Sequence, residues 1–172
     1  MDTDEGPARV DFDKMKTLTP SFEKEGTITA ANASKISDGA AAMVVSSRKE
    51  GAISRIVSWG GHAQATEKFT TAPVAAIQNA LLRANWTVDD VDLWEVNEAF
   101  AVVPMVVEKD LGVPRDRLNV RGGAIALGHP IGASGARILV TLLHVLEDRD
   151  AKRGVAAICI GGGEALAMCV ER

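Results

Sequence analysis

Two kinds of hydrophobic pattern alternate along this chain. Short, nearly continuous apolar runs bounded by glycine or polar residues predict strands, whereas apolar residues three and four positions apart predict helices. Strands are expected at residues 42–45, 53–59, 93–96, 118–120, 155–160 and 165–170, and helices at residues 73–85, 97–112 and 136–149, after a short helix that begins at Ser37. Strands and helices therefore alternate over most of the sequence.

The last two predicted strands flank a turn of three glycines, Gly161 to Gly163, and should form an antiparallel hairpin. The earlier strands are separated by helices, an order that produces parallel neighbours in a sheet. A sheet with both kinds of pairing is mixed. We therefore expect an α/β layered fold with a mixed five-stranded sheet and helices on both faces, preceded by the helix and strand of residues 37–45 as the end of another unit.

A change in composition marks the expected domain boundary. Residues 1–25 combine charges and prolines with scattered apolar residues and are predicted to be irregular. Residues 27–34 form a loop of small side chains, and a polar break at residues 48–51 precedes the first strand of the sheet. We therefore divide the chain into residues 1–50, the tail of one domain, and residues 51–172, a second domain.

The composition limits the class of partner. The chain has 172 residues, of which 47% are hydrophobic, and this is enough for a real core. Its formal net charge of -4 provides no broad basic field, so nucleic acids and anionic membranes are disfavoured as partners. Because neither a leader-like start nor an apolar run long enough for a bilayer is evident, we predict a soluble, cytoplasmic protein that binds a small molecule or another protein.

The two cysteines, Cys159 and Cys169, are predicted to be free thiols because the hairpin places them out of register. A free cysteine in an apolar strand is most often a small buried hydrophobic residue, and we assign that role to Cys169. Cys159 differs because it ends its strand beside the three glycines, whose backbone N–H groups could hold a developing oxyanion or thiolate. Cys159 is therefore the candidate for chemistry, with simple burial as the alternative.

His129 and Asn97 are the other candidates for chemistry. His129 lies in a loop at residues 122–135 that is crowded with glycines, which let the backbone approach another group closely. Asn97 follows a predicted strand, where it could cap a helix or bind an oxygen through its amide. Each also has a structural interpretation, since a loop histidine can simply bond a backbone group. Loops beyond strand ends converge in open α/β sheets, so Asn97, His129 and Cys159 can meet.

Other kinds of site find no support in the sequence. The chain contains neither a Walker loop nor a dinucleotide-binding fingerprint, and Gly132-Ala133-Ser134-Gly135 lacks the pattern of the hydrolase nucleophile elbow. The three histidines and two cysteines show no metal-ligand spacing, so no metal site is predicted.

Three segments, in this order, resemble the C-terminal motifs of thiolases: Asn97-Glu98-Ala99-Phe100, the run at residues 122–137 that contains Gly128-His129-Pro130-Ile131-Gly132, and Cys159-Ile160-Gly161-Gly162-Gly163. The motif around His129 is highly specific. Residues 26–34 resemble the family's coenzyme-A-binding loop, so the likeness covers the chain from about Leu18 onward. The resemblance implies a thiolase-like layered fold, with the end of an N-terminal lobe followed by a C-terminal lobe.

The resemblance also implies roles for the candidate catalytic residues. His129 would deprotonate a nucleophilic cysteine and would share an oxyanion hole in which the Asn97 side chain holds a water. Cys159 would exchange a proton with the methyl group of acetyl-CoA, and the backbone N–H of Gly161 would help to form a second oxyanion hole.

The implied binding residues are Ala30 and Ser34, which would touch the pantetheine arm of coenzyme A, and Phe100, which would line the pocket. Coenzyme A thioesters would be the substrates, and no cofactor would be bound permanently.

The sequence departs from the family pattern in several places. Family members carry a second cysteine, which is acylated, in an N-terminal lobe, and neither Cys159 nor Cys169 matches its motif. The family tends to place glycine after the Ser34 position and asparagine at the Arg121 position, whereas this chain has Lys35 and Arg121. Most of the family's loop domain, which grips the nucleotide end of coenzyme A, is missing as well.

The leading hypothesis is therefore the C-terminal part of an acetyl-CoA C-acetyltransferase, an acyltransferase of acetoacetyl-CoA thiolysis and acetyl-CoA condensation, inactive as an isolated chain. It would need an N-terminal half or a second subunit, expose an apolar patch, and form a homo-oligomer, either a dimer or a tetramer. The alternative is a non-catalytic thiolase-fold fragment or protein-binding scaffold. A condensing enzyme of the ketoacyl-synthase type is disfavoured because those enzymes usually present two histidines.

Overall fold

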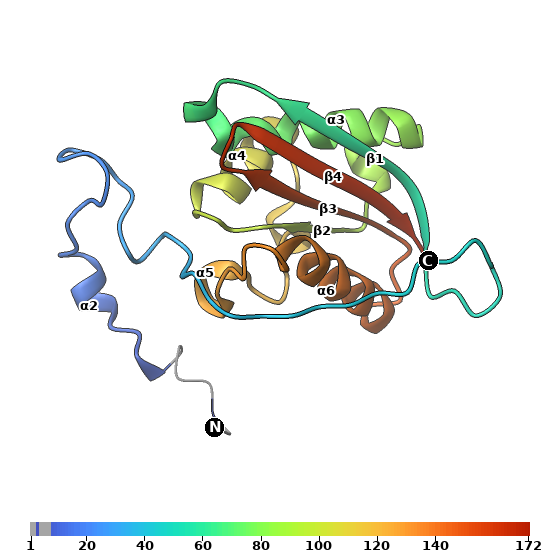
Figure 1. Ribbon diagram of the computed structural model, residues 1–172, viewed down its shortest axis with the longest axis horizontal. Coiled ribbons are helices and arrows are strands. Elements are labelled where there is room, and N and C mark those ends of the chain that lie inside the picture. Colours follow the sequence, from blue (N-terminus) through green and yellow to red (C-terminus); the bar gives the residue numbers. More distant parts are fainter. Residues whose placement is uncertain (1–2, 4–7) are drawn as a thin grey trace.

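The computed structural model describes residue 3 and residues 8–172, so the parts of the predicted lead-in at residues 1–2 and 4–7 lie outside the described residues. The N-terminal part of the described chain forms an arm beside a layered body made by the rest (Figure 1). The arm carries the short helix α2 (Phe12–Met15), whose first turn is capped by the Asp11 side chain. The arm then runs along the body before it joins the sheet.

A mixed sheet of four strands forms the centre of the body. Its strands are β1 (Arg55–Ala63), β2 (Leu93–Val96), β3 (Arg153–Ile160) and β4 (Glu164–Glu171), in the order β1-β4-β3-β2. β3 and β4 form the predicted antiparallel hairpin, β1 pairs antiparallel with β4, and β2 pairs parallel with β3. The predicted α/β class and mixed sheet are confirmed.

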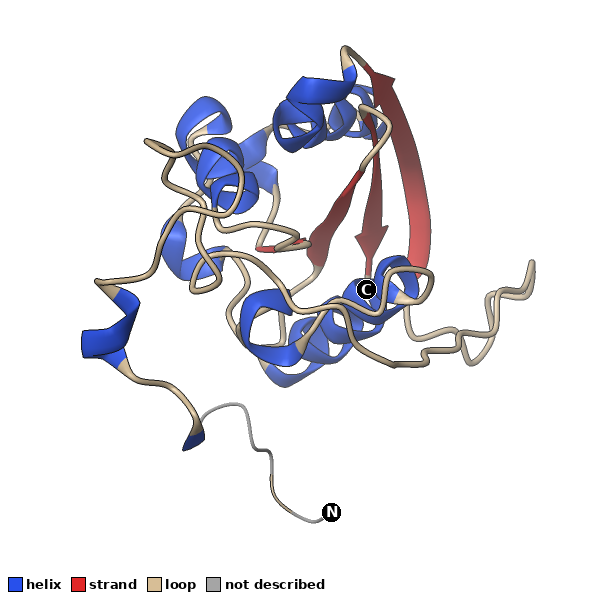
Figure 2. Ribbon diagram, turned by 60° about the vertical axis from the view of Figure 1, so that its left-hand side comes forward, coloured by secondary structure: helices blue, strands red, loops and turns tan. Residues whose placement is uncertain are grey.

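Helices cover both faces of the sheet, as predicted (Figure 2). α3 (Ala72–Ala84) and α4 (Val102–Leu111) pack on one face, and α6 (Ser134–Asp148) packs on the other against β2 and β3. Successive strand residues alternate accordingly, with Trp94 in the core under α3 and α4 and Leu93 in the core under α6. Short helical turns complete the fold: η1 (Thr66–Thr71), η2 (Val88–Asp90), η3 (Arg115–Arg117) and α5 (Ala124–Leu127). Among the helices that the structure describes, none is long and apolar enough to cross a membrane.

The fifth predicted strand, at residues 118–120, is wrong, because a single bridge from Leu118 to Trp94 is all that pairs it with β2. Asn119 substitutes for further pairing. Its backbone N–H donates to Trp94 O (2.9 Å), and its side-chain amide accepts from Val96 N–H and donates to Val96 O, at 2.8 Å each. A left-handed backbone at Asn119 (φ 47°), which asparagine tolerates, then turns the chain away. The Asn119 side chain therefore makes hydrogen bonds to β2 that backbone groups would make in a fifth strand.

The predicted helix from Ser37 and the predicted strand at residues 42–45 are also wrong for the described structure. The segment has no regular secondary structure and is largely exposed, with Val44 and Val45 at 98% and 76% exposure. A strand needs a neighbour to satisfy its backbone N–H and C=O groups, and none of the four described strands pairs with this segment. Its apolar sequence is typical of a strand whose partners belong to another polypeptide segment.

Two boundaries differ from the prediction, and others agree with it. The helix expected from Asn97 begins only at Val102, so Asn97 is not an N-cap and is instead 1% exposed after β2. β1 continues beyond Trp59 to Ala63, because β4 offers a paired residue at each added position. The helices predicted at residues 73–85 and 136–149 are confirmed to within two residues as α3 and α6.

β1 crosses α3 at Gly60, where the two backbones touch. A Cβ atom added to Gly60 would overlap Ala76 O and would lie 2.5 Å from Ala80 N, both backbone atoms of α3. Ser58, two residues earlier on the same face, holds the helix there because its Oγ donates to Ala80 O (2.6 Å). The glycine therefore sets the distance between α3 and the sheet.

We expect Gly60→Ala to lower the free energy of unfolding by about 3 kcal/mol, because helix backbone cannot move aside cheaply. Gly61→Ala is the matched control: its Cβ would lie 3.4 Å from Leu166 Cδ2, an ordinary contact, and the effect should stay within about 0.5 kcal/mol. Urea denaturation of both variants measures the difference. Equal stability of the two would show that α3 is not seated by Gly60.

Candidate active site

The site is built at the end of the sheet where β2 and β3 both finish. These carboxyl ends lie side by side because the two strands are parallel, with Val96 opposite Ala157. Asn97 directly follows β2 and donates its backbone N–H to Ala157 O (2.9 Å), and Gly161 directly follows β3. The α5 turn, which precedes His129, lies near this end of the sheet in Figure 1.

The His129 loop is held in place by the arm. The backbone N–H of His129 donates to Lys35 O (2.7 Å), and Ile36 pairs with His129 in a single parallel bridge. Gly128 adopts a positive φ of 95°, and a Cβ added there would lie 2.8 Å from Ser37 Cβ. The arm and this glycine together fix where the imidazole ring can lie.

A continuous chain of hydrogen bonds orients the His129 ring. Arg137 Nη2 donates to Asn97 Oδ1 (3.2 Å), Asn97 Nδ2 faces His129 Nε2 (3.2 Å), and His129 Nδ1 faces Ser134 Oγ (2.6 Å). The Ser134 hydroxyl in turn donates to Pro130 O (3.2 Å). We call the side chains of Arg137, Asn97, His129 and Ser134 the site relay.

Only one direction of hydrogen bonding satisfies the site relay. A guanidinium group can only donate, so Asn97 presents its oxygen to Arg137 and its amide NH2 group to His129. His129 Nε2 therefore accepts, and the relay assigns the ring proton to Nδ1, where it points at Ser134 Oγ. An unprotonated Nε2 is the form of histidine that acts as a base.

The electrostatic environment favours the same neutral form. Burial lowers the pKa of His129 below its ordinary value of 6.5, and the positive charge of Arg137 lowers this pKa further. Both neighbours of the ring are shielded from solvent, since Asn97 and Ser134 are 1% and 0% exposed, whereas His129 itself is half-buried. The ring is therefore neutral at pH 7 and still reachable from the surface.

Cys159 lies one residue before the end of β3, opposite Ala165 of β4. It is 7% exposed and belongs to the core under α3 and α4, against which Phe100 packs. Burial raises the pKa of the Cys159 thiol, so the thiol stays protonated at neutral pH. The side-chain hydrogen bonds of His129 go to Asn97 and Ser134 rather than to this thiol. The structure thus brings Cys159 to the same end of the sheet without bonding it to the relay.

Both cysteines are free, as predicted. Cys169 is fully buried opposite Val155, well down the hairpin from the site.

In the turn between β3 and β4, Gly163 has a φ of 103°, and an added Cβ would lie 3.2 Å from Thr66 N, so this position requires glycine. Gly161 is different: it is exposed, and nothing lies within 4 Å of a Cβ placed there. Gly161 therefore leaves open space at the end of β3.

The loop of residues 26–34 lies against the segment that follows Asn97. The N–H and Oγ of Ser34 both donate to Ala99 O, at 3.0 and 2.9 Å. Ser34 is therefore placed next to Phe100, whereas Ala30 is exposed in a turn of the loop. The structure brings together two of the three predicted binding residues and leaves the third open to solvent.

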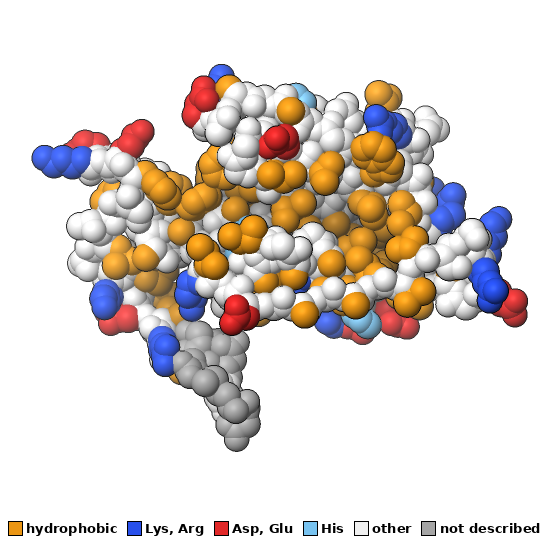
Figure 3. All heavy atoms as spheres, viewed as in Figure 1, with side chains coloured by type: hydrophobic (Ala, Val, Ile, Leu, Met, Phe, Trp, Pro, Cys, Tyr) orange, Lys and Arg blue, Asp and Glu red, His pale blue; other side chains and the backbone are white. Residues whose placement is uncertain are grey.

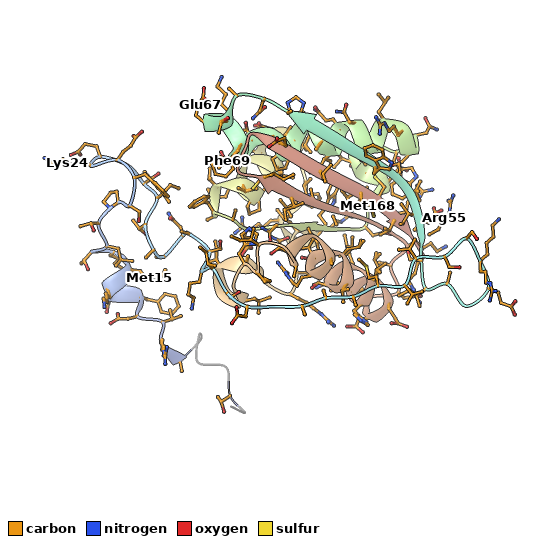
Figure 4. The ribbon with its side chains drawn as sticks, viewed as in Figure 1. Met15, Lys24, Arg55, Glu67, Phe69 and Met168 are labelled. Carbon is orange, nitrogen blue, oxygen red and sulfur yellow. The ribbon has the colours of Figure 1, made fainter. Side chains whose placement is uncertain are left out.

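Three phenylalanines form an aromatic cluster at this end of the sheet. The Phe100 ring meets the rings of Phe22 and Phe69 edge-to-face, with centroids 5.8 and 6.1 Å apart. Phe69 is seen at the left end of the sheet in Figure 4, the end where β3 finishes. A surface hollow of about 450 Å³ lies beside the cluster, lined by Phe22, Glu23, Glu25, Gly26, Thr27 and Ile28. The cluster joins the arm to the site.

Sequence reasoning missed three charged or polar residues at the site. Ser134 and Arg137 lie in the first turn of α6, three residues apart, and this spacing puts them on one helix face. Glu95 is a charged residue inside the otherwise apolar β2 and is only 2% exposed. Both signals were present in the sequence, as a polar pair at helical spacing after His129 and as a carboxylate within a buried strand.

The two unusual positions of the sequence lie at the edge of the site. Lys35 contributes its backbone oxygen to the His129 loop, while the residue itself is exposed. Arg121 forms a surface ion pair with Asp148. Within the described residues, no three His, Cys, Asp or Glu side chains gather closely enough to hold a metal ion.

Family models match nearly the whole chain. A model described as "Thiolase, C-terminal domain" matches residues 51–172, and one described as "Thiolase, N-terminal domain" matches residues 1–49. The acetyl-CoA acetyltransferase of Shinella zoogloeoides is 50% identical over 93% of the chain, and the cytosolic acetyl-CoA acetyltransferase of Mus musculus is 48% identical over 94%. The chain spans only 42% and 43% of the lengths of these two relatives.

Solved structures of related proteins also match nearly the whole chain. The crystal structure of the Bacillus anthracis acetyl-CoA acetyltransferase is 37% identical, with a TM-score of 0.90 over 98% of this chain and 45% of that one. The crystal structure of human mitochondrial 3-ketoacyl-CoA thiolase in complex with CoA is 35% identical, with a TM-score of 0.86 over 99% of this chain and 45% of that one.

Proposed function

This chain belongs to the thiolase family, and from that premise we propose that it is the part of an acetyl-CoA C-acetyltransferase that supplies the base and the proton donor. The reaction is thiolysis of acetoacetyl-CoA and, in reverse, condensation of acetyl-CoA. Because the chain spans less than half of its relatives, we assign the nucleophilic cysteine to an N-terminal part that assembles with it.

The observation that carries the proposal is the site relay. It leaves an unprotonated His129 Nε2 at the carboxyl ends of β2 and β3, beside an Asn97 amide with one N–H still to donate. A base and an oxyanion donor at one point are what carbon–carbon cleavage next to a thioester requires. The protonated thiol of Cys159 at the same end of the sheet supplies the remaining acid.

In the proposed thiolysis, each proton that is removed has a named acceptor. His129 Nε2 takes the proton of the nucleophilic cysteine, whose sulfur bonds to the ketone carbon of acetoacetyl-CoA as the central carbon–carbon bond breaks. The electron pair of that bond forms the enolate of acetyl-CoA, whose oxygen accepts hydrogen bonds at the Asn97 and His129 side. The Cys159 thiol donates its proton to the enolate carbon and is left as a thiolate.

The second half of the reaction restores both groups. Incoming coenzyme A gives its thiol proton to the Cys159 thiolate and attacks the acyl group on the nucleophilic cysteine. The departing cysteine recovers its proton from His129. We assign the oxyanion of this step to the backbone N–H of Gly161, an exposed residue directly after β3.

We assign coenzyme A to the loop of residues 26–34 and the aromatic cluster. A related structure is a complex with CoA, and it covers nearly all of this chain. Ser34 and Phe100 lie together at the site, with the exposed Ala30 further along the loop. In this arrangement the pantetheine arm reaches the site between the loop and the Phe100 ring, and no cofactor is bound permanently.

An uncovered apolar face supports an N-terminal part as the partner. α6 covers β2 and β3, but the same face of the sheet is open near the β3–β4 turn, where Leu166 of β4 and Ile160 of β3 are 49% and 43% exposed; further along β4, Val170 is buried in the core under α6. Figure 3 shows hydrophobic side chains gathered over this side of the molecule. We propose that the exposed Val44 and Val45 also contact the N-terminal part. In this proposal residues 1–50 complete the N-terminal lobe, and residues 51–172 form the C-terminal lobe.

The assembled enzyme is proposed to be a homo-oligomer of such complexes, a dimer or a tetramer. We place it in the cytoplasm, with support from relatives of Mus musculus and Rattus norvegicus whose names carry the word cytosolic.

The proposal is tested by co-expressing this chain with the N-terminal part of the Shinella zoogloeoides relative and assaying acetoacetyl-CoA thiolysis. Activity is expected from the purified complex and from neither part alone. A well-folded complex without thiolysis activity would contradict the catalytic roles proposed for His129 and Cys159. The chain would then be a protein-binding scaffold with a thiolase fold.

A further inference from the structure

Arg137, a member of the site relay, and Glu95 of the neighbouring strand β2 both have buried polar atoms without a hydrogen-bond partner. Glu95 occupies the middle of β2, on the face that α6 covers, and is 2% exposed. In the part of the chain that the structure describes, its Oε1 has no hydrogen-bond partner, and neither have Nε and Nη1 of Arg137. Unpaired buried polar atoms cost free energy and are rare in native proteins.

Glu95 and Arg137 make no direct hydrogen bond with each other, and their charges act on each other across the interior between β2 and α6. Burial lowers the pKa of the Arg137 guanidinium, and the negative charges of Glu95 and then Glu98 raise it again. Burial raises the pKa of Glu95 to about 7, against the attraction of Arg137; Glu98 raises this pKa and Arg121 lowers it. The negative charge of Glu95 therefore favours the cationic form of Arg137 more than that of Glu98 does.

Stability alone does not account for this pair. Charged side chains cost free energy to bury, and even a buried ion pair contributes little net stability, so apolar residues of similar volume often serve as well or better. The other residues of β2 are Leu93, Trp94 and Val96, all apolar and buried. A carboxylate among them serves a purpose other than packing.

We propose that Glu95 and Arg137 are positioning residues, in which the Glu95 carboxylate anchors Arg137 so that Arg137 Nη2 fixes the Asn97 amide and holds His129 in its Nδ1–H form. The catalytic meaning of this arrangement rests on the proposed function. The arrangement itself belongs to this chain and can be measured without any reaction.

The consequence of losing the arginine follows from hydrogen-bond direction. Without an obligatory donor at Asn97 Oδ1, the amide can turn over and present its oxygen to His129 Nε2. That contact favours a proton on Nε2, which removes the lone pair that acts as the base. The orientation of one amide therefore decides whether His129 is a base or a donor.

Nitrogen-15 NMR of the imidazole rings tests this on the isolated chain, which has only three histidines, His62, His129 and His144. Loss of one signal in His129→Gln assigns the ring. The wild-type ring is expected in the Nδ1–H form. Arg137→Gln should shift it toward the Nε2–H form and raise its midpoint of protonation, and Arg137→Lys, which keeps a charged donor, should restore much of the wild-type spectrum.

Glu95→Gln is the second variant and removes the anchor while keeping the shape. In the wild type, the His129 signals should show a small inflection near pH 7 as Glu95 ionises. The inflection should vanish in Glu95→Gln and persist in the control Glu164→Gln, which removes an exposed carboxylate from β4. In the co-expressed enzyme, Glu95→Gln should lower kcat about tenfold with little change in KM.

Two results would overturn the proposal. One is a wild-type His129 in the Nε2–H form, which needs no variant to fold. The other is a His129 spectrum and titration in Arg137→Gln and Glu95→Gln that match the wild type. A silent co-expressed enzyme with the expected NMR shifts would instead reject the proposed function and leave the positioning intact.

Discussion

His129→Ala is expected to lower thiolysis by the co-expressed enzyme by about 10³-fold, because general acid–base catalysis contributes on the order of 10² to 10⁴. The variant loses the group that takes the proton of the nucleophile and one hydrogen-bond donor to the enolate. In the wild type, activity should fall on the acid side only as the pH drops through the His129 pKa, which lies below its ordinary value of 6.5. Steady-state rates between pH 5 and 9, at about unit intervals, measure both effects.

His144→Ala is the matched control for this experiment. His144 lies on α6, and its side chain is largely exposed beside Glu147. Its removal should leave the rate within about twofold of the wild type, because surface substitutions away from packed features change little. Equal losses in the two variants would mean that the assay reports assembly of the complex rather than chemistry at His129.

The position of the site followed from strand order. Asn97 and Gly161 were both expected beyond strand ends, and because β2 and β3 are parallel neighbours, those ends lie at the same edge of the sheet, with β3 three residues longer. What the pattern could not supply is the set of contacts among side chains distant in sequence. The link from Arg137 to Asn97 spans 40 residues, and the link from Asn97 to His129 spans 32.

The failures of prediction have physical causes that differ from one segment to the next. At residues 118–120 the apolar pattern was that of a strand, but the side chain of Asn119 took the hydrogen bonds that a strand would have made. At residues 42–45 the pattern was also that of a strand, and there no described strand is available to pair with it. Local sequence encodes the preference for a strand, and the neighbour decides whether one forms.

Exchange of the acetyl-CoA methyl protons with solvent deuterium should stop in Cys159→Ala, and thiolysis by the co-expressed enzyme should fall by about 10³-fold. The cause is loss of the only acid assigned to the enolate carbon. The fold should tolerate the change, since the side chain shrinks by one sulfur at a strand end, and we expect a loss of about 1 kcal/mol in the free energy of unfolding. Mass spectrometry of recovered acetyl-CoA measures the exchange directly.

Cys169→Ala is the matched control and should give the opposite result, a less stable domain with its chemistry retained. Cys169 is fully buried among the strands, opposite Ser58 of β1 and Val155 of β3, so its loss should destabilise the domain by about 1 to 2 kcal/mol while exchange and thiolysis persist. Both thiols have a pKa raised by burial, so acidity alone does not distinguish them. Only their positions differ: Cys159 lies one residue before the end of β3 and two residues before Gly161, whereas Cys169 lies down the hairpin opposite Val155. Deuterium exchange that survives in Cys159→Ala would assign the proton transfer to another group.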